Sequence, residues 1–200
     1  MRGLAAIALS CALVIPAAGC ASTPVSRFYN LSAAPTPAAA TSSNLSVAVG
    51  LVSVPAAVDR PQIVVSTGPN QVRLDEFNRW ASPLQDNISR VVAENLVAML
   101  GTSRVTQTLN ADADYRAAIE VQRFESAPGE AATLDAVWAV RHVKDGKSET
   151  GRTTVREPAL EKGYAALAAA HSRAVARLSR DIADAVRALD SRPTAAQAER

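Results

Sequence analysis

The stretch SPLQDNISRVVAENLVAMLG, residues 82–101, combines a helix start, an apolar stripe and a helix stop, and the expected fold is built around it. Ser82 is suited to cap the first backbone N–H groups, Pro83 fits the first helical turn, and Gln85 completes a capping box. Gly101 can adopt the left-handed conformation that ends a helix. The apolar residues recur at helical spacing: Leu84, Ile88, Val91, Val92, Leu96 and Met99. These signals predict an amphipathic helix.

Short strands are expected upstream of this helix. Residues 45–54 are rich in β-branched side chains, and Pro55 ends the run. The alternation places one set of side chains on a common face: Leu45, Val47, Val49 and Leu51. Residues 62–67 form a second apolar run, and Gly68-Pro69-Asn70 is a turn sequence. Residues 71–74 can then return as the partner strand of a hairpin.

Downstream of residue 101 the spacing of apolar residues changes to two. A short strand is expected within 103–108, followed by alternating strands over 115–124 and 133–143. Asp145-Gly146 predicts a tight hairpin turn, because both of its central positions favour a positive φ. The Thr-rich residues 148–156 return as a polar strand that suits a sheet edge.

A second long helix is expected over residues 163–189. Its apolar residues again recur at helical spacing: Tyr164, Leu167, Val175, Leu178, Ile182, Val186 and Leu189. Strand blocks separated by single helices favour an α+β domain, here assigned to residues 44–190. We expect an antiparallel or mixed β-sheet with two amphipathic helices packed on one face, followed by a disordered tail over 191–200.

The N-terminus has the pattern of an export signal. Arg2 precedes a charge-free apolar run that is too short to span a bilayer, and small residues lead up to Cys20. A Cys at this junction indicates a lipoprotein, with residues 1–19 removed and Cys20 carrying the lipid; an ordinary secretory signal is the alternative. The other cysteine, Cys11, leaves with the signal, so no disulfide is expected.

Residues 20–43 are assigned to the lipid anchor and a flexible linker, because Ala, Ser, Thr and Pro predominate. The segment RFYNL, residues 27–31, interrupts this composition. Its alternating side chains favour a short strand that adds to a sheet edge, and a local irregularity is the alternative. Ala21 follows the Cys, which favours the periplasmic face of the outer membrane over retention in the inner membrane.

The sequence offers no motif for catalysis, metal binding or phosphate binding. It lacks a nucleophile elbow and a Gly-rich phosphate loop. No His, Cys, Asp or Glu at the spacing of a metal-ligand motif accompanies His142 or His171. A net charge of +2 is too small for a nucleic-acid-binding protein. We therefore expect a protein that is not an enzyme, carries no metal and no cofactor apart from the lipid on Cys20, and binds no nucleic acid.

The segment between the first strand and the first helix is the candidate surface for a partner or for oligomer formation. Its candidate residues are Asp59, Arg60, Gln62, Arg79 and Trp80. Pro61 fixes a bend after Arg60. Trp80 has two interpretations, a packing anchor over the helix start or an exposed recognition residue.

Several of these segments together resemble the ABC-type transport auxiliary lipoproteins. The resemblance lies in the junction at Cys20, RFYNL, VGLVSVPAAVDRPQIVV, FNRWASPLQDNISRVVAENL and the Ala-rich C-terminal helix. It implies an outer-membrane lipoprotein that works with an ABC transporter and a bridging protein of the mammalian-cell-entry (MCE) type, moving lipids or other hydrophobic molecules and supporting envelope integrity. It also implies a homo-oligomer, because some relatives assemble as rings.

Two other functions remain open at this point. One is an accessory lipoprotein of another envelope assembly or secretion pathway, which would share the anchor and the small domain. The other is an enzyme that acts on envelope polymers, which would need an acid/base pair that the sequence does not show.

Overall fold

The computed structural model describes residues 24–34, 43–108, 112–159 and 161–191, so the expected signal peptide, Cys20 and the tail beyond residue 191 lie outside the described residues. The elements follow in the order β1 (Arg27–Tyr29), β2 (Val47–Ser53), β3 (Gln62–Gly68), β4 (Gln71–Trp80), α1 (Leu84–Leu100), β5 (Val105–Thr106), β6 (Tyr115–Ala127), β7 (Ala131–His142), β8 (Ser148–Pro158) and α2 (Tyr164–Asp190).

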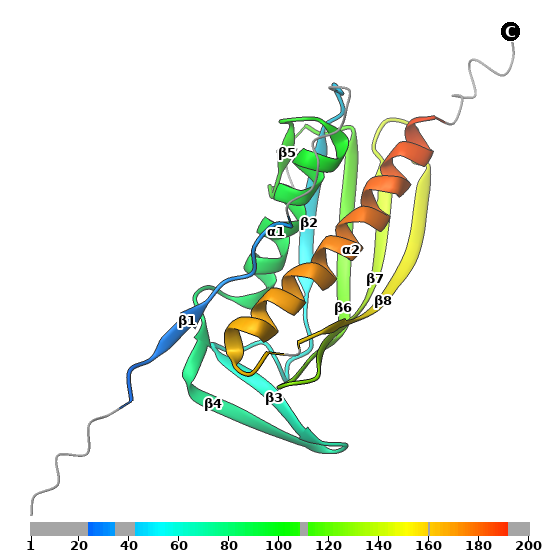
Figure 1. Ribbon diagram of the computed structural model, residues 1–200. Coiled ribbons are helices and arrows are strands. Elements are labelled where there is room, and N and C mark those ends of the chain that lie inside the picture. The colour runs from blue at the N-terminus through cyan, green and yellow to red at the C-terminus, as the bar shows by residue number, and fades with distance from the viewer. Residues whose placement is uncertain (1–23, 35–42, 109–111, 160, 192–200) are drawn as a thin grey trace, which may run out of the picture.

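The eight strands form one mixed sheet in which β6 is the branching strand. One edge of β6 pairs with the antiparallel β7–β8 meander. Its other edge is shared by two parallel partners, β2 along the first half and β3 at Ser126. β5 extends the sheet beyond β2, and β4 and β1 extend it beyond β3. Figure 1 shows α1 and α2 on the same face of this sheet, which confirms the expected α+β architecture.

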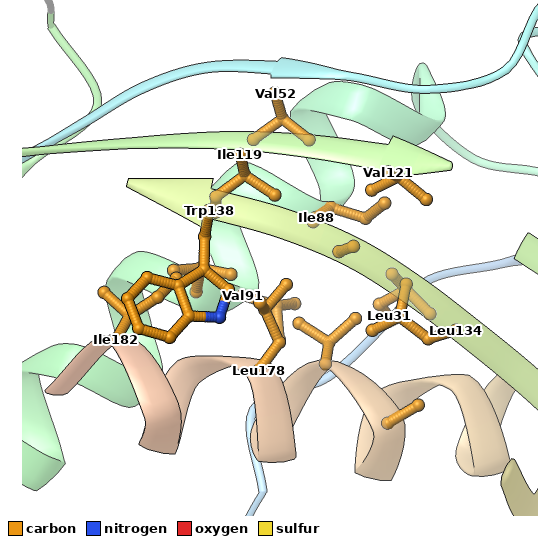
Figure 2. Packing of buried hydrophobic residues seen from close by; sticks show 14 of the residues in the cluster. Leu31, Val52, Ile88, Val91, Ile119, Val121, Leu134, Trp138, Leu178 and Ile182 are labelled. Carbon is orange, nitrogen blue, oxygen red and sulfur yellow. The ribbon is translucent and has the colours of Figure 1, made fainter. Parts of the chain in front are cut away.

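The alternation on β6 and β7 and the two helical stripes point into one core, as expected. On β7 the inward residues are Leu134, Ala136, Trp138 and Val140, and all four are buried. Figure 2 shows Trp138 beside Ile182 and Leu178 of α2, between the sheet and the helix. Burial of these side chains is the main source of stability for such a layered domain.

The start of α1 differs from the expected capping box. Pro83, with φ −48° and ψ 136°, is the N-cap residue, and its carbonyl accepts the N–H of Asn87 at 3.0 Å. No side chain caps the helix, because Ser82 lies one residue too early to reach its first N–H groups. The expected end is confirmed, since Gly101 has a φ of 64°.

Leu51 does not share the face of β2 that was predicted for it together with Val47 and Val49. The pairing of β2 with β6 shifts register between Val49 and Val52, as a β-bulge does. The extra residue reverses the alternation, so that Val52 is buried and the side chain of Leu51 is 77% exposed. The strand expected over 71–74 is also longer than predicted, because β4 continues to Trp80.

The predicted addition of residues 27–31 to a sheet edge is confirmed, because β1 pairs in parallel with the end of β4. Leu31 then enters the core between the sheet and the helices, with 1% of its surface exposed. The folded part of the chain therefore begins before residue 44.

A strap formed by residues 31–34 crosses both helices after β1. The backbone N–H groups of Leu31 and Ala34 donate to the side-chain oxygens of Asn87 and Asn95 on α1, at 3.2 and 3.1 Å. The N–H of Ser32 donates to Ser172 on α2 at 3.1 Å. Polar residues on the inner sides of the helices thus satisfy the backbone of the strap, which buried backbone groups require.

Candidate functional site

The candidate contact residues lie at the end of the molecule formed by β1 and the β3–β4 hairpin (Figure 1). Asp59 and Arg60 are exposed on a turn in which the N–H groups of Val58 and Asp59 donate to the carbonyl of Pro55. The carbonyl of Pro61 accepts the N–H of Trp80 at 2.7 Å, which fixes this turn against the end of β4. The sequence thus presents Asp59 and Arg60 to solvent on a well-anchored loop.

Gln62 and Arg79 face one another across the hairpin and share one acidic residue. They are register partners on β3 and β4. The side-chain amide of Gln62 donates to Glu76 at 3.3 Å, and Arg79 contacts the same carboxylate at 3.5 Å. Arg79 also donates to the backbone carbonyl of Glu76 at 2.8 Å. Such an exposed ion pair contributes little stability, so the cluster remains available for an external contact.

Trp80 is a packing anchor and not a surface recognition residue. Only 5% of its side chain is exposed. Its ring meets Phe124 of β6 and His171 of α2 edge-on, with centroids 6.1 and 6.3 Å away. The inclusion of Trp80 in the contact surface is therefore wrong in this structure, because the end of β4 turns its last side chain into the core.

A polar network that sequence reasoning missed joins the hairpin to the helix layer. The hydroxyl of Tyr164, the first residue of α2, donates to Asp75 on β4 at 2.6 Å and accepts from Arg73 at 3.3 Å. Partial burial raises the pKa of Asp75, but the hydrogen bonds from Tyr164, from Asn78 and from two backbone N–H groups outweigh it and lower the pKa to about 2. Asp75 is therefore a carboxylate at neutral pH.

The apolar residues of β4 lie on the solvent side, the reverse of the usual alternation. Arg73 and Asp75 are register partners of the buried Val65 and Ile63 and bind Tyr164. Val72 and Leu74 alternate with them, and their side chains are 63% and 40% exposed. The alternation itself was visible in the sequence, but which set faces outward was not.

A groove of about 260 Å³ lies between the hairpin and β6. Its apolar lining comes from the loop before β3, from the hairpin and from β6: Pro55, Ala57, Val58, Val64, Val72 and Phe124. Gln122, Arg123 and Glu125 add polar groups, and Arg123 pairs with Glu125 at 3.5 Å. The hairpin end therefore combines exposed charge, exposed apolar side chains and a shallow apolar groove.

Comparison with known proteins identifies the family. The family of the ABC-type transport auxiliary lipoprotein component matches residues 29–183, which is most of the chain. The chain belongs to this family. The matched range includes the end of β1 and the strap, so these segments belong to the same unit as the sheet and helices.

Two solved structures share the fold of this auxiliary lipoprotein component. Protein XCC0632 from Xanthomonas campestris is 24% identical, with a TM-score of 0.67, over 79% of this chain and 93% of its own. An uncharacterized protein is 20% identical, with a TM-score of 0.69, over 82% of this chain and 99% of its own. No curated protein sequence matches the chain.

Neither histidine of this auxiliary lipoprotein component lies in an open site. His171 stacks on Phe124 with ring centroids 3.8 Å apart, and its Nε2 lies 2.8 Å from the hydroxyl of Ser126. Both side chains are buried, and burial lowers the pKa of His171 to about 3. The Nδ1 of His142 pairs with Asp145 at 2.7 Å at the β7–β8 turn. In this conformation the imidazole of His171 is shielded from solvent, and Ser126 lies at the base of the groove between the hairpin and β6.

Two further features concern metals and membranes. Among the described residues, no group of three or more His, Cys, Asp or Glu side chains is placed to hold a metal ion. Within the same residues, neither helix is apolar over enough of its length to cross a bilayer.

Proposed function

We propose that the chain is an outer-membrane-anchored periplasmic lipoprotein subunit of an ABC/MCE-type system that moves lipids or other hydrophobic molecules between membranes and supports envelope integrity. It is attached through acyl chains on Cys20 and acts by docking to the MCE-domain bridging protein and its ABC transporter, not by catalysis. No metal or cofactor takes part.

The observation that carries this proposal is the family match over residues 29–183, which starts nine residues after the lipobox-like Cys20. A transport auxiliary lipoprotein needs an anchor and a folded domain next to it, and the position of Cys20 just before the matched range supports this arrangement. Several buried acyl chains make such an anchor essentially permanent.

The exposed turn that carries Asp59 and Arg60 is the proposed partner contact, with Gln62 and Arg79 beside it. Charged groups on a rigid turn set the orientation and rate of association more than its strength. Trp80 holds the turn in place: its backbone N–H donates to the carbonyl of Pro61, and its ring packs in the core against Phe124 and His171.

Affinity purification from the native host tests the docking. We expect a tagged chain to recover an MCE-domain protein after mild cross-linking, and the Arg60→Glu variant to recover several-fold less. The Arg180→Glu variant is the matched control, because Arg180 is an exposed arginine on α2, away from the turn. Recovery of a secretion or export complex in place of the MCE-domain protein would refute the proposed pathway.

Mass measurement of the detergent-extracted chain tests the anchor. The mature protein should begin at Cys20 and carry acyl chains, and the Cys20→Ala variant should lose both the acyl mass and stable membrane attachment. The Cys11→Ala variant, altered at the other cysteine of the chain, should behave as wild type. An unmodified mature N-terminus in the wild-type protein would rule out the lipoprotein assignment.

A further inference from the structure

The distance between the anchor and the fold limits where the membrane can lie. Cys20 precedes Arg27, the first residue of β1, by seven residues. A fully extended chain of that length spans about 25 Å, which is less than the length of α2, about 40 Å for its 27 residues. If Cys20 is acylated, as the proposed function requires, β1 stays near the bilayer.

The β1 end of the molecule also carries most of the exposed apolar side chains. The large hydrophobic residues exposed there are Val25, Phe28, Val72, Leu74 and Phe77. Elsewhere in the described residues the exposed ones are Leu51, Val97 and Val143, on three separate elements or loops. Figure 1 shows β1 and the hairpin at one end of the molecule and the end of α2 at the other.

Strand register places three of these side chains on one face. Phe28 is the register partner of Arg79, which pairs with Gln62. Tyr29, the neighbour of Phe28, turns its ring to Tyr164 of α2 with centroids 6.1 Å apart, and Arg73 and Asp75, the neighbours of Val72 and Leu74, bind the same tyrosine. Phe28, Val72 and Leu74 therefore share the face opposite the helices, with Phe28 64% exposed.

The polar side chains on the inner side of β4 already have hydrogen-bond partners within the protein. Arg73 and Asp75 bind Tyr164 there, so the hairpin cannot turn its apolar side inward without breaking this network. Arg79, the register partner of Phe28, adds a cationic side chain to the same face, where it also pairs with Glu76 at 3.5 Å. Cationic side chains next to apolar ones favour contact with anionic lipid headgroups.

We propose that the outer face of the hairpin end, formed by Phe28, Val72 and Leu74, lies on the phospholipid surface beside the acyl anchor. The bilayer is the occupant because the tether holds this face next to it. The far end of α2 then points towards the periplasm. Gln62 and Arg79 share the face of Phe28, so the part of the proposed contact surface that stays open to a protein partner is the turn with Asp59 and Arg60 at the rim.

Quenching of tryptophan fluorescence by brominated phospholipids tests this orientation. The native Trp80 and Trp138 are buried and give a constant background. The acylated Val72→Trp variant, with acylation verified by mass, is placed in phosphatidylethanolamine–phosphatidylglycerol vesicles that contain a brominated phosphatidylcholine. We expect loss of most of the added emission. The Val97→Trp variant is the matched control on α1 and should keep its emission.

The Phe28→Trp variant serves as a second reporter on the same face, in case the change at Val72 disturbs the hairpin. Equal quenching of the Val72→Trp and Val97→Trp variants, or none at positions 72 and 28, would overturn the inference. Absence of acyl mass on the wild-type chain would also overturn it. If lipid quenching is absent and the Val72→Asp variant loses a defined oligomer, the face contacts a second copy of the chain and not the bilayer. The vesicles contain no transporter, so failure of the pathway assignment leaves the readout unchanged.

Discussion

Tyr164 at the start of α2 donates its hydroxyl hydrogen to Asp75 on β4 across 2.6 Å, joining residues that are 89 positions apart in the sequence. We expect the Tyr164→Phe variant to raise the pKa of Asp75 from about 2 towards its ordinary value of 3.8. Loss of a hydrogen bond to a charged group should also lower the free energy of unfolding by about 1–2 kcal/mol.

Carbon-detected NMR titration of the Asp75 carboxyl group and urea unfolding at neutral pH measure the two effects. The Tyr29→Phe variant is the control, because it removes a hydroxyl that bonds Asn78 at 2.8 Å and not Asp75. An unchanged titration of Asp75 in the Tyr164→Phe variant would show that the bond does not form in solution.

His171 should make the fold sensitive to mild acid. Burial holds the pKa of His171 at about 3 in the folded state, against 6.5 ordinarily, so between these two values the unfolded chain binds up to one more proton than the folded one. The free energy of unfolding should therefore fall by about 1.4 kcal/mol per pH unit from this residue as the pH drops from about 6 to 4.

Urea unfolding across this pH range checks the dependence on His171. The double variant His171→Leu, Ser126→Ala removes the imidazole together with the hydroxyl that bonds it, and its stability should change much less between pH 6 and 4. A double variant with the wild-type slope would contradict a neutral, buried His171.

Position 151 requires glycine, because the indole of Trp138 occupies the space that a side chain would fill. The two residues are register partners on β8 and β7, and a Cβ at Gly151 would lie 2.3 Å from the Trp138 ring. We expect the Gly151→Ala variant to lose about 1–3 kcal/mol of unfolding free energy, because the ring and backbone must shift. Gly68→Ala is the control, since its added Cβ meets only Gln71 at 3.9 Å. Thermal unfolding followed by circular dichroism would distinguish them, and equal midpoints would show that Trp138 moves freely.

Leu31 tests whether the strap belongs to the fold. Its side chain is buried, so the Leu31→Ala variant should lose about 2–5 kcal/mol of unfolding free energy. The Val25→Ala variant, at an exposed position just before β1, should lose almost none. Urea midpoints measure both changes. A neutral Leu31→Ala variant would mean that residues 31–34 detach from the helices in solution.

The helices and the β6–β8 meander could be predicted because their signals are local. Each apolar stripe is repeated over many residues, and Gly101 and Asp145-Gly146 mark the ends of their elements. The face of Leu51 could not be predicted, because a bulge depends on how β2 pairs with β6. The prediction that Ser82 caps the helix was wrong by one residue, because Pro83 is the N-cap residue and the helix starts after it.

The site was only partly predictable. Exposed Asp59 and Arg60 follow from a Pro-containing turn, but the burial of Trp80 depends on Phe124 and His171, which come from distant parts of the chain. The outward face of β4 likewise depends on Tyr164. A strand that alternates polar and apolar residues cannot reveal which set has partners until the rest of the fold is known.

The strap has a mechanical consequence. A force that pulls on the N-terminus acts along β1, whose parallel bonds to β4 are loaded in shear, and the next contacts along the chain are the strap bonds to Asn87, Ser172 and Asn95. Leu31 would have to leave the core before the chain lengthened further. A pull on the N-terminus would therefore load the sheet edge and both helices before the chain beyond residue 34 could extend.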